Sequence, residues 1–161
     1  INECVVTGCT DATACNFDPS ASTDDGSCDF SCYGCTDATA SNYDINATLD
    51  DGSCCFDNYL TLSMNDSFGV GWNGNTFTIT DANGVVIATA TLAAGAAGTE
   101  TFCIPDGCAY SFTCGGGSWA SEVSWVLSDA TGTLASGGAP ASGTFDLNCA
   151  GPITGLSLIH I

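Results

Sequence analysis

The sequence predicts a mainly β protein in which disulfide-rich, loop-dominated tandem repeats are followed by an antiparallel β-sandwich, jelly-roll-like in type. Two observations lead to this fold class. Residues 1–55 contain eight of the twelve cysteines and almost no apolar periodicity, whereas residues 56–151 are rich in β-branched residues, aromatic residues and glycine. We therefore expect a repeat domain at 1–55, a β-sandwich domain at 56–151 and a tail at 152–161.

The first domain is built on an acidic cassette that occurs twice. Residues 8–28 read GCTDATACNFDPSASTDDGSC and residues 34–54 read GCTDATASNYDINATLDDGSC, so that 15 of 21 positions agree after a shift of 26 residues. Both copies keep two cysteines, a constant set of Asp and Asn, and a DDGSC ending. A repeat that retains oxygen ligands and cysteines favours metal binding and disulfides over catalysis.

The constant Asp and Asn residues are candidate calcium ligands. Calcium takes about six to eight oxygens, which carboxylates and carbonyls in a tight loop supply. The spacing is not that of an EF-hand, whose D-x-[DN]-x-[DN]-G pattern is missing. The alternative is that these side chains cap turns and bond to the local backbone; two copies with the same set favour calcium. The predicted metal ligands are Asp11, Asn16, Asp18, Asp24, Asp25, Asp37, Asn42, Asp44, Asp50 and Asp51.

Twelve cysteines in 161 residues indicate disulfides made in an oxidising compartment. The matched cysteines at the two ends of each cassette would close a loop of about 20 residues and contribute about 3 kcal/mol. Two further cysteines flank a Pro-Asp-Gly turn, and another two lie at the ends of the second domain. The predicted bridges are Cys9–Cys28, Cys35–Cys54, Cys103–Cys108 and Cys55–Cys149.

Two other cysteines have partners that the repeat does not define. Cys15 has Ser41 as its counterpart in the second cassette, so that its partner must lie outside the repeat pattern, with Cys4 and Cys32 as candidates. Cys114 is then an odd residue, which we expect to pair with the N-terminal segment or with another subunit.

The absence of basic residues restricts the partners of this chain. It has no Lys and no Arg, and 18 Asp and Glu residues give a formal net charge of −18. Typical composition would supply roughly 20 basic residues. Without a basic surface, nucleic acid and anionic membranes are poor partners, and no apolar run is long enough for membrane insertion. The charge favours a calcium-rich exterior, the alternative being that it only gives solubility.

The second domain shows alternation typical of short strands. Leu60, Leu62 and Met64 lie on one face of the first strand, and the turn at 81–84 leads into a hairpin partner. The predicted strands cover 59–64, 76–80, 85–92, 99–104, 109–114, 122–128, 133–136 and 143–148. The expected core comprises Phe77, Ile79, Phe102, Phe112, Val123, Trp125, Leu127 and Phe145.

The cassette, written C-T-D-A-x-A-x-N-[FY]-D-x-x-A-x-x-D-D-G-S-C, resembles a repeat of secreted and cell-surface proteins of Bacteroidota. Those proteins are typically large, multidomain products of the type IX secretion route with adhesive or structural roles. The Asp-rich calcium repeats of thrombospondin type 3 are similar too, though less closely. The resemblance covers residues 8–54 and implies location and architecture more than any activity.

The loop DSFGVGWNG at 66–74 resembles the D-S-[WFY]-G-D-G-W-N-G loop of β-sandwich domains found beside such repeats. EVSW at 122–125 and GGAP at 137–140 fit the later part of that pattern. The resemblance implies a metal ligand at the second Asp of the loop, which Val70 replaces here. We therefore interpret the loop as a Gly-rich turn that docks Trp72 into the sandwich edge, in preference to a metal site around Asp66 and Asn73.

The chain ends are interpreted separately from the fold. LSLIHI at 156–161 is what the DNA string CTGTCTCTTATACACATC encodes, a transposase adapter used in library preparation, so we interpret this segment as a sequencing-adapter scar. The only histidine, His160, lies in it and is not assigned as a ligand or base. Because residue 1 is Ile, we expect a mature or internal segment.

The sequence does not predict an enzyme. A nucleophilic triad lacks a credible histidine. A glycosidase needs a carboxylate pair in a cleft, and Glu100 and Glu122 lie in or beside predicted strands with no evident partner.

We expect an extracellular structural protein: a subunit or segment of a cell-surface fibre or adhesin, stiffened by calcium and disulfides, that self-associates or joins neighbouring domains of a longer chain. The alternative is a carbohydrate-binding or adhesion module of a larger secreted protein, with Trp72, Trp119 and Tyr110 as stacking surfaces. Asn46 and Asn65 lie in N-x-[ST] sequons and are candidate glycosylation sites.

Overall fold

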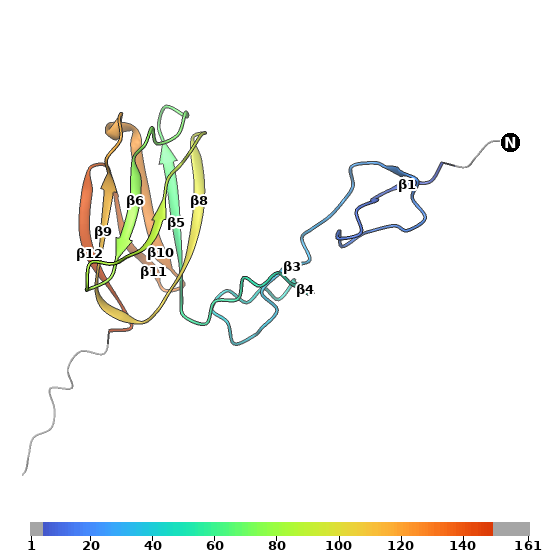
Figure 1. The fold of residues 1–161 in the computed structure, drawn as a ribbon, viewed down its shortest axis with the longest axis horizontal. Helices are drawn as coiled ribbons and strands as arrows, with labels where there is room; N and C mark the ends of the chain where they lie inside the picture. The colour runs from blue at the N-terminus through green and yellow to red at the C-terminus, as the bar shows by residue number, and fades with distance from the viewer. Residues whose placement is uncertain (1–4, 150–161) are drawn as a thin grey trace, which may run out of the picture. The chain divides into compact units, whose positions relative to one another are not determined.

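The computed structural model describes residues 5–149 and divides into two compact units, residues 1–56 and 57–161 (Figure 1). This division lies one residue after the predicted domain boundary. The predicted tail at 152–161, with its adapter segment, lies outside the described residues, as do Cys4 and His160. No helix within residues 5–149 is long and apolar enough to cross a bilayer.

Short parallel strand pairs form the framework of the first unit. In the first cassette Thr7 pairs with Thr23, and an isolated bridge joins Cys9 to Phe17. The same pairings recur 26 residues later in the second cassette, so that the sequence repeat is also a structural repeat. The four strands are β1 (Thr7–Gly8), β2 (Thr23–Asp24), β3 (Tyr33–Gly34) and β4 (Leu49–Asp50).

Disulfide bonds close both cassettes as predicted. Cys15 uses Cys32, one of its two candidate partners, and this bond joins the first cassette to the segment that precedes the second. A hydrogen bond from the Tyr33 hydroxyl to the Thr13 carbonyl oxygen (2.7 Å) spans the same junction. The three bridges are Cys9–Cys28, Cys15–Cys32 and Cys35–Cys54, with Cα–Cα distances of 4.8, 6.0 and 4.7 Å.

Little apolar surface is buried in the cassettes. The buried hydrophobic residues are Cys9 and Ala14 in the first and Cys35 and Ala40 in the second, whereas the Phe17 ring is 40 % exposed. Hydrophobic burial therefore contributes little here, since its free energy scales with the apolar area removed from water. Disulfides, each contributing about 3 kcal/mol for such loops, and hydrogen-bonded turns hold the unit together.

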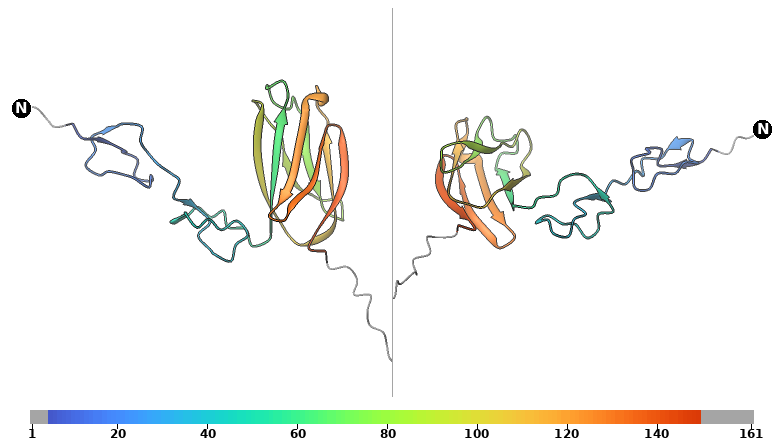
Figure 2. Two further views of the ribbon diagram at one scale, coloured as in Figure 1. Left: turned by 180° about the vertical axis from the view of Figure 1, so that it is seen from behind. Right: turned by 60° about the horizontal axis from the view of Figure 1, so that its bottom comes forward.

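The second unit is a β-sandwich of two four-stranded antiparallel sheets (Figure 2). One sheet has the order β11-β10-β5-β8 and the other β12-β9-β6-β7. Of the seven connections between consecutive strands, β6–β7 and β10–β11 stay within a sheet and five cross between sheets, which confirms an antiparallel β-sandwich. The strands are β5 (Asn58–Asp66), β6 (Thr76–Thr80), β7 (Val86–Ala90), β8 (Ala97–Ile104), β9 (Gly107–Gly115), β10 (Val123–Asp129), β11 (Gly132–Gly138) and β12 (Ala141–Leu147).

All eight predicted strands are present, and several are longer than predicted. β9, for example, runs from Gly107 to Gly115 and so extends the expected segment at both ends. Its backbone continues to pair beyond the apolar alternation, with Gly107 opposite Leu147 and Gly115 opposite Thr76. Glycine carries no hydrophobic signal, so the pairing of these ends was not visible in the residue pattern.

Aromatic side chains from the two sheets meet in the core. Trp125 of β10 packs edge-on against Phe77 and Phe112 of the opposite sheet, with ring centroids 4.7 and 5.1 Å apart. The predicted core residues are buried except Phe102, which is only partly buried at its edge. The core also contains Trp72, Ile104, Tyr110 and Leu147, which the strand pattern did not single out.

Two predicted bridges of the sandwich are wrong. Cys108 pairs with Cys149 (Cα–Cα 5.0 Å), which excludes both the Cys103–Cys108 and the Cys55–Cys149 bond. The Pro-Asp-Gly turn connects β8 of one sheet to β9 of the other and is no hairpin, whereas β12 runs antiparallel to β9 and brings Cys149 beside its start. Cys55 and Cys103 are disulfide-bonded as well.

Cys114 is not available for a bond with another subunit, which corrects the prediction made for it. It is a free thiol on β9, buried between the sheets with 2 % of its surface exposed. Burial raises the pKa of the thiol to about 11. Since the thiolate is the reactive form, this cysteine is a core residue and not a cross-linking site.

We expect Cys114 to resist alkylation in the folded protein. Iodoacetamide at pH 8 should leave its chymotryptic peptide unmodified, because the thiol is both protonated and inaccessible. The same treatment after unfolding in urea, without reductant, should modify it, as read by mass spectrometry. Native labelling at the rate of a small-molecule thiol would contradict the buried position.

The cassettes should depend on their disulfides more than the sandwich does. Replacing Cys35 and Cys54 by Ser removes about 3 kcal/mol from a cassette that has almost no core, so the backbone amide signals of residues 34–54 should lose their dispersion in a ¹H–¹⁵N spectrum. The matched variant C108S/C149S should lower the melting temperature of the sandwich while its amide signals stay dispersed. Retained dispersion of residues 34–54 in C35S/C54S would contradict this account.

Candidate functional site at the loop end of the sandwich

Three connecting segments meet at one end of the sandwich, opposite the end at which the chain enters β5 (Figure 1). They are 67–75 between β5 and β6, 91–96 between β7 and β8, and 116–122 between β9 and β10, which includes the 3₁₀ helix η1 (Ala120–Glu122). Backbone hydrogen bonds from Trp72 N to the Leu92 oxygen (2.7 Å) and from Ser118 N to the Asn73 oxygen (3.1 Å) join them. The three segments therefore form one continuous surface.

Asp66, at the end of β5, organises the first segment. The residue is 3 % exposed, and its carboxylate accepts hydrogen bonds from four successive backbone N–H groups of the loop. Burial by itself would raise the pKa of Asp66, but these donors outweigh it and hold the pKa below its usual value. The donors are the amides of Phe68 (3.3 Å), Gly69 (2.9 Å), Val70 (2.7 Å) and Gly71 (2.9 Å).

Trp72 anchors the loop to the core of the sandwich, as predicted from the Gly-rich turn. Its side chain is fully buried, and its indole N–H donates to the Asn65 carbonyl oxygen (2.9 Å). Gly71 precedes it with φ 94°, and a Cβ there would lie 2.6 Å from the Leu92 oxygen. Trp72 and the 6 % exposed Tyr110 are therefore core residues, which corrects their assignment as stacking surfaces.

Asn75 fixes the first segment to the third. It is fully buried, and its side-chain amide donates to the Trp72 and Ser118 carbonyl oxygens, both at 2.7 Å, while its Oδ1 accepts from the Gly117 amide (3.1 Å). The Thr91 hydroxyl donates to the Asn75 carbonyl oxygen (2.7 Å) and brings in the second segment. Asp66 and Asn75 are the buried polar residues of the described chain, and both hold this loop surface.

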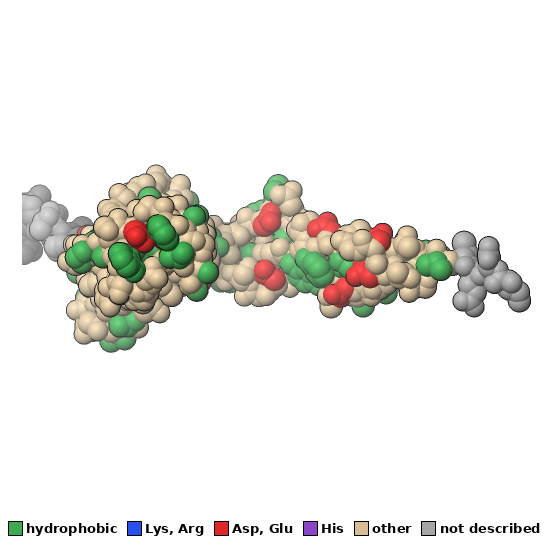
Figure 3. Space-filling model, turned by 90° about the horizontal axis from the view of Figure 1, so that it is seen from above, with side chains coloured by type: hydrophobic (Ala, Val, Ile, Leu, Met, Phe, Trp, Pro, Cys, Tyr) green, Lys and Arg blue, Asp and Glu red, His purple; other side chains and the backbone are tan. Residues whose placement is uncertain are grey.

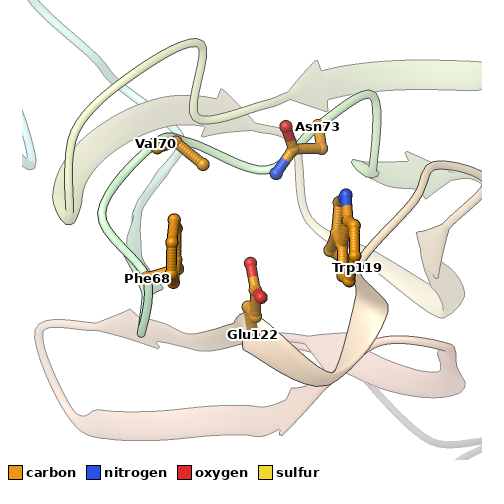
Figure 4. A pocket seen from close by; sticks show the side chains of 5 residues that line it. All are labelled: Phe68, Val70, Asn73, Trp119 and Glu122. Carbon is orange, nitrogen blue, oxygen red and sulfur yellow. The ribbon is translucent and has the colours of Figure 1, made fainter.

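A pocket of about 250 Å³ opens on this surface (Figure 4). The rings of Phe68 and Trp119 stand on either side of the Glu122 carboxylate, and the Asn73 amide points toward the same space. Both rings are largely exposed, Phe68 to 74 % and Trp119 to 68 %. The pocket is lined by Phe68, Val70, Asn73, Trp119 and Glu122.

One of the lining residues holds a strained backbone. Trp119 has φ 56°, in the left-handed region that bulky residues rarely occupy, whereas Asn73, with φ 49°, belongs to a residue type that adopts this region readily. Strain of this kind persists where the surrounding structure enforces it, and it clusters at functional sites. Here the hydrogen bond from Ser118 N to the Asn73 oxygen supplies part of that enforcement.

The cassette residues predicted as metal ligands lie in hydrogen-bonded turns. Asp11 Oδ1 accepts from the amide (2.9 Å) and the hydroxyl (2.7 Å) of Thr13, and Asp37 does the same with Thr39. Asp18, Asp24, Asp25, Asp44, Asp50 and Asp51 each accept from the backbone amide two residues ahead. Asn16 and Asn42 bridge to the carbonyl oxygens of Ser27 and Ser53, both at 2.7 Å.

This arrangement is the turn-capping alternative considered for the same residues. Among residues 5–149, no three His, Cys, Asp or Glu side chains come close enough together to hold a metal ion. The cassette carboxylates thus bond to their own turns and do not converge on one point. Gly26 and Gly52, which follow the paired Asp residues, take positive φ values of 76° and 77°, as a tight turn requires.

Some of the residues that line the pocket could be predicted from the sequence, and the others could not. Trp119 was among the predicted stacking residues, and Glu122 lies directly before β10 at the expected strand entry. Phe68 and Asn73 are in the loop that the motif singled out, but nothing in the motif shows which side chains face outward. The sequon residues Asn46 and Asn65 are both exposed.

Comparison with protein-family models, curated proteins and solved structures finds no match for this chain.

Replacing Asp66 by Asn should destabilise the sandwich and loosen the pocket loop, because a neutral amide accepts the four N–H groups less well. The lowered pKa sets the pH dependence: the contribution of Asp66 is complete above the unfolded value of about 3.9 and is lost as the pH falls through the lower folded value. The difference in melting temperature between wild type and D66N should therefore be constant from pH 7 to 5 and shrink below pH 3.9.

The matched control is Asp81→Asn, which alters an acceptor in the remote β6–β7 turn. We expect a smaller loss of melting temperature, because Asp81 accepts two backbone amides in an exposed turn. Equal losses for D66N and D81N at every pH would contradict the role given to Asp66.

Proposed function

We propose that this chain is an extracellular structural protein, a segment or subunit of a cell-surface fibre or adhesin, in which covalently clamped repeats serve as a spacer for a β-sandwich. The observation that carries the proposal is the exact recurrence of bonds between the cassettes. The bridge Cys9–Cys28 and the bond from Asp18 N to the Cys9 oxygen (2.9 Å) reappear as Cys35–Cys54 and as Asp44 N to the Cys35 oxygen (3.0 Å). A repeating scaffold that needs almost no core suits a spacer.

The charge and the disulfides support an extracellular location. Disulfide bonds persist in oxidising compartments, and the described residues hold many of them. A net charge of −18 with no Lys or Arg keeps the chain soluble and offers no cleavage site to trypsin-like proteases. The likeness of the cassette to repeats of secreted Bacteroidota proteins adds to this and makes the type IX route part of the proposal.

The proposal is non-catalytic. Glu122 is the one carboxylate among the residues that line the pocket, and Glu100 lies exposed on β8. Glycoside hydrolysis uses two facing carboxylates, which these positions do not supply.

A binding or adhesion module is the second candidate function, and the pocket favours it. The pocket brings two largely exposed aromatic rings together on a loop surface that buried hydrogen bonds hold in place. The pocket is lined by residues of the segments that connect β5 to β6 and β9 to β10, at the end of the sandwich opposite the start of β5. Carbohydrate binding would use the rings of Trp119 and Phe68 for stacking.

Stiffening of the cassettes by calcium is a separate part of the proposal. It rests on the net charge of −18 and on the repeated carboxylates, since those carboxylates bond to their own turns in the structure. Assembly and calcium dependence are tested together. The oxidised chain, purified from the periplasm, is examined by light scattering and negative-stain microscopy in calcium and in EGTA, with magnesium as the control ion. We expect calcium to promote self-association or to raise the melting temperature of the cassettes. The variant that carries C9S, C28S, C35S and C54S together should lose this response to calcium. Monodisperse monomers in all conditions would remove the fibre from the proposal, and identical melting in calcium and EGTA would remove calcium.

A further inference from the structure

We propose that the loop pocket of the sandwich binds an ammonium group carried by its ligand, such as the amine of an amino sugar or a quaternary amine. This inference rests on the second candidate function, the binding module, and names the chemistry of its ligand. It is carried by the juxtaposition of Phe68, Trp119 and Glu122 around one pocket (Figure 4).

The rings supply the first element of the argument. Aromatic faces carry negative partial charge and attract cations placed over them, with the strongest effect at Trp. Phe68 and Trp119 flank the pocket and keep 74 % and 68 % of their surfaces exposed, so their faces are not occupied by the core. A compact cation between them gains contact with both rings.

Glu122 supplies the second element. Its carboxylate lies between the two rings and makes no hydrogen bond to any residue of the described range. The chain contains no Lys and no Arg, so this carboxylate has no internal basic partner on the sandwich. Figure 3 shows the same end of the unit with an acidic side chain flanked by hydrophobic ones. A half-buried carboxylate without a partner favours a ligand that brings the positive charge.

The net charge of the chain and the rigidity of the pocket loops also favour binding of a cation. The net charge of −18 raises the local concentration of cations and repels anions. Asp66 and Asn75 hold the pocket loops through buried hydrogen bonds, so that little conformational entropy is lost when a ligand enters. The Asn73 amide donates one N–H to the Gly71 oxygen (2.9 Å) and keeps the other for a ligand hydroxyl.

A neutral sugar would use the rings and Asn73 but not the charge of Glu122. The substitution Glu122→Gln keeps the shape of the side chain and removes its charge, so it separates the two ligand classes. Glu100, exposed on β8, is the matched control, since E100Q makes the same change in net charge away from the pocket.

The test is titration of the full oxidised chain, followed by ¹H–¹⁵N spectra and tryptophan fluorescence. Tetramethylammonium and glucosamine are compared with the uncharged probes N-acetylglucosamine and glucose. We expect both ammonium probes to bind and to shift the amides of residues 68–73 and 118–122. E122Q should weaken binding about tenfold and W119A about threefold, and E100Q should leave it unchanged. Binding should also weaken with added salt.

The outcomes distinguish failure of the inference from failure of the proposed function. Equal binding of glucose and glucosamine, unaffected by E122Q, would overturn the ammonium assignment and keep the binding module. Binding of tetramethylammonium without binding of glucosamine would restrict the site to quaternary ammonium groups and overturn its assignment to the amine of an amino sugar. If no probe binds while the spectra remain those of a folded sandwich, both the ammonium site and the binding module are rejected, and the structural proposal stands on the assembly test alone.

Discussion

The absence of positive side chains is the constraint on which the rest of the structure depends. In a chain with no Lys or Arg, carboxylates find their hydrogen bonds in backbone amides and hydroxyls. The cassette Asp residues accept from the amide two residues ahead, and Asp66 and Asp129 accept from the loops that follow them. The pKa values of Asp11, Asp66 and Asp129 are accordingly held below the usual range. Acidic side chains thus build the turns of both units.

The two units reach stability by different physical means. Each cassette buries little beyond a cysteine and an alanine and relies on disulfides, which act mainly by restricting the unfolded chain. The sandwich buries an aromatic cluster around Trp125, where the hydrophobic effect dominates. A covalent scaffold tolerates sequence change wherever its cysteines and turn residues are kept, which explains why the two cassettes differ mostly at exposed positions such as Ile45.

The loop surface combines these devices at one place. Asp66 and Asn75 satisfy backbone groups of the loops, the Trp72 side chain is fully buried, and Trp119 holds a strained backbone conformation. What remains outside is a pair of rings around a carboxylate. The sequence of this loop resembles a metal-binding motif, but the Asp66 carboxylate accepts hydrogen bonds from the amides of its own loop. The loop therefore positions aromatic side chains.

The residue pattern alone determined the features that depend on near neighbours: the eight strands from alternation, the positive φ of Gly26 and Gly52 from the Asp-Asp-Gly turns, and the cassette bridges from matched cysteines. Alternation tells which side chains share a face of a strand, but not which strands pair. Only the tertiary structure decided that Cys108 meets Cys149, that Cys114 is buried, and that Trp119 is exposed while Trp72 and Tyr110 are not. These features depend on how strands far apart in the sequence pair and pack, and most connections cross between the two sheets. Contacts between distant segments leave no periodic signal in the sequence.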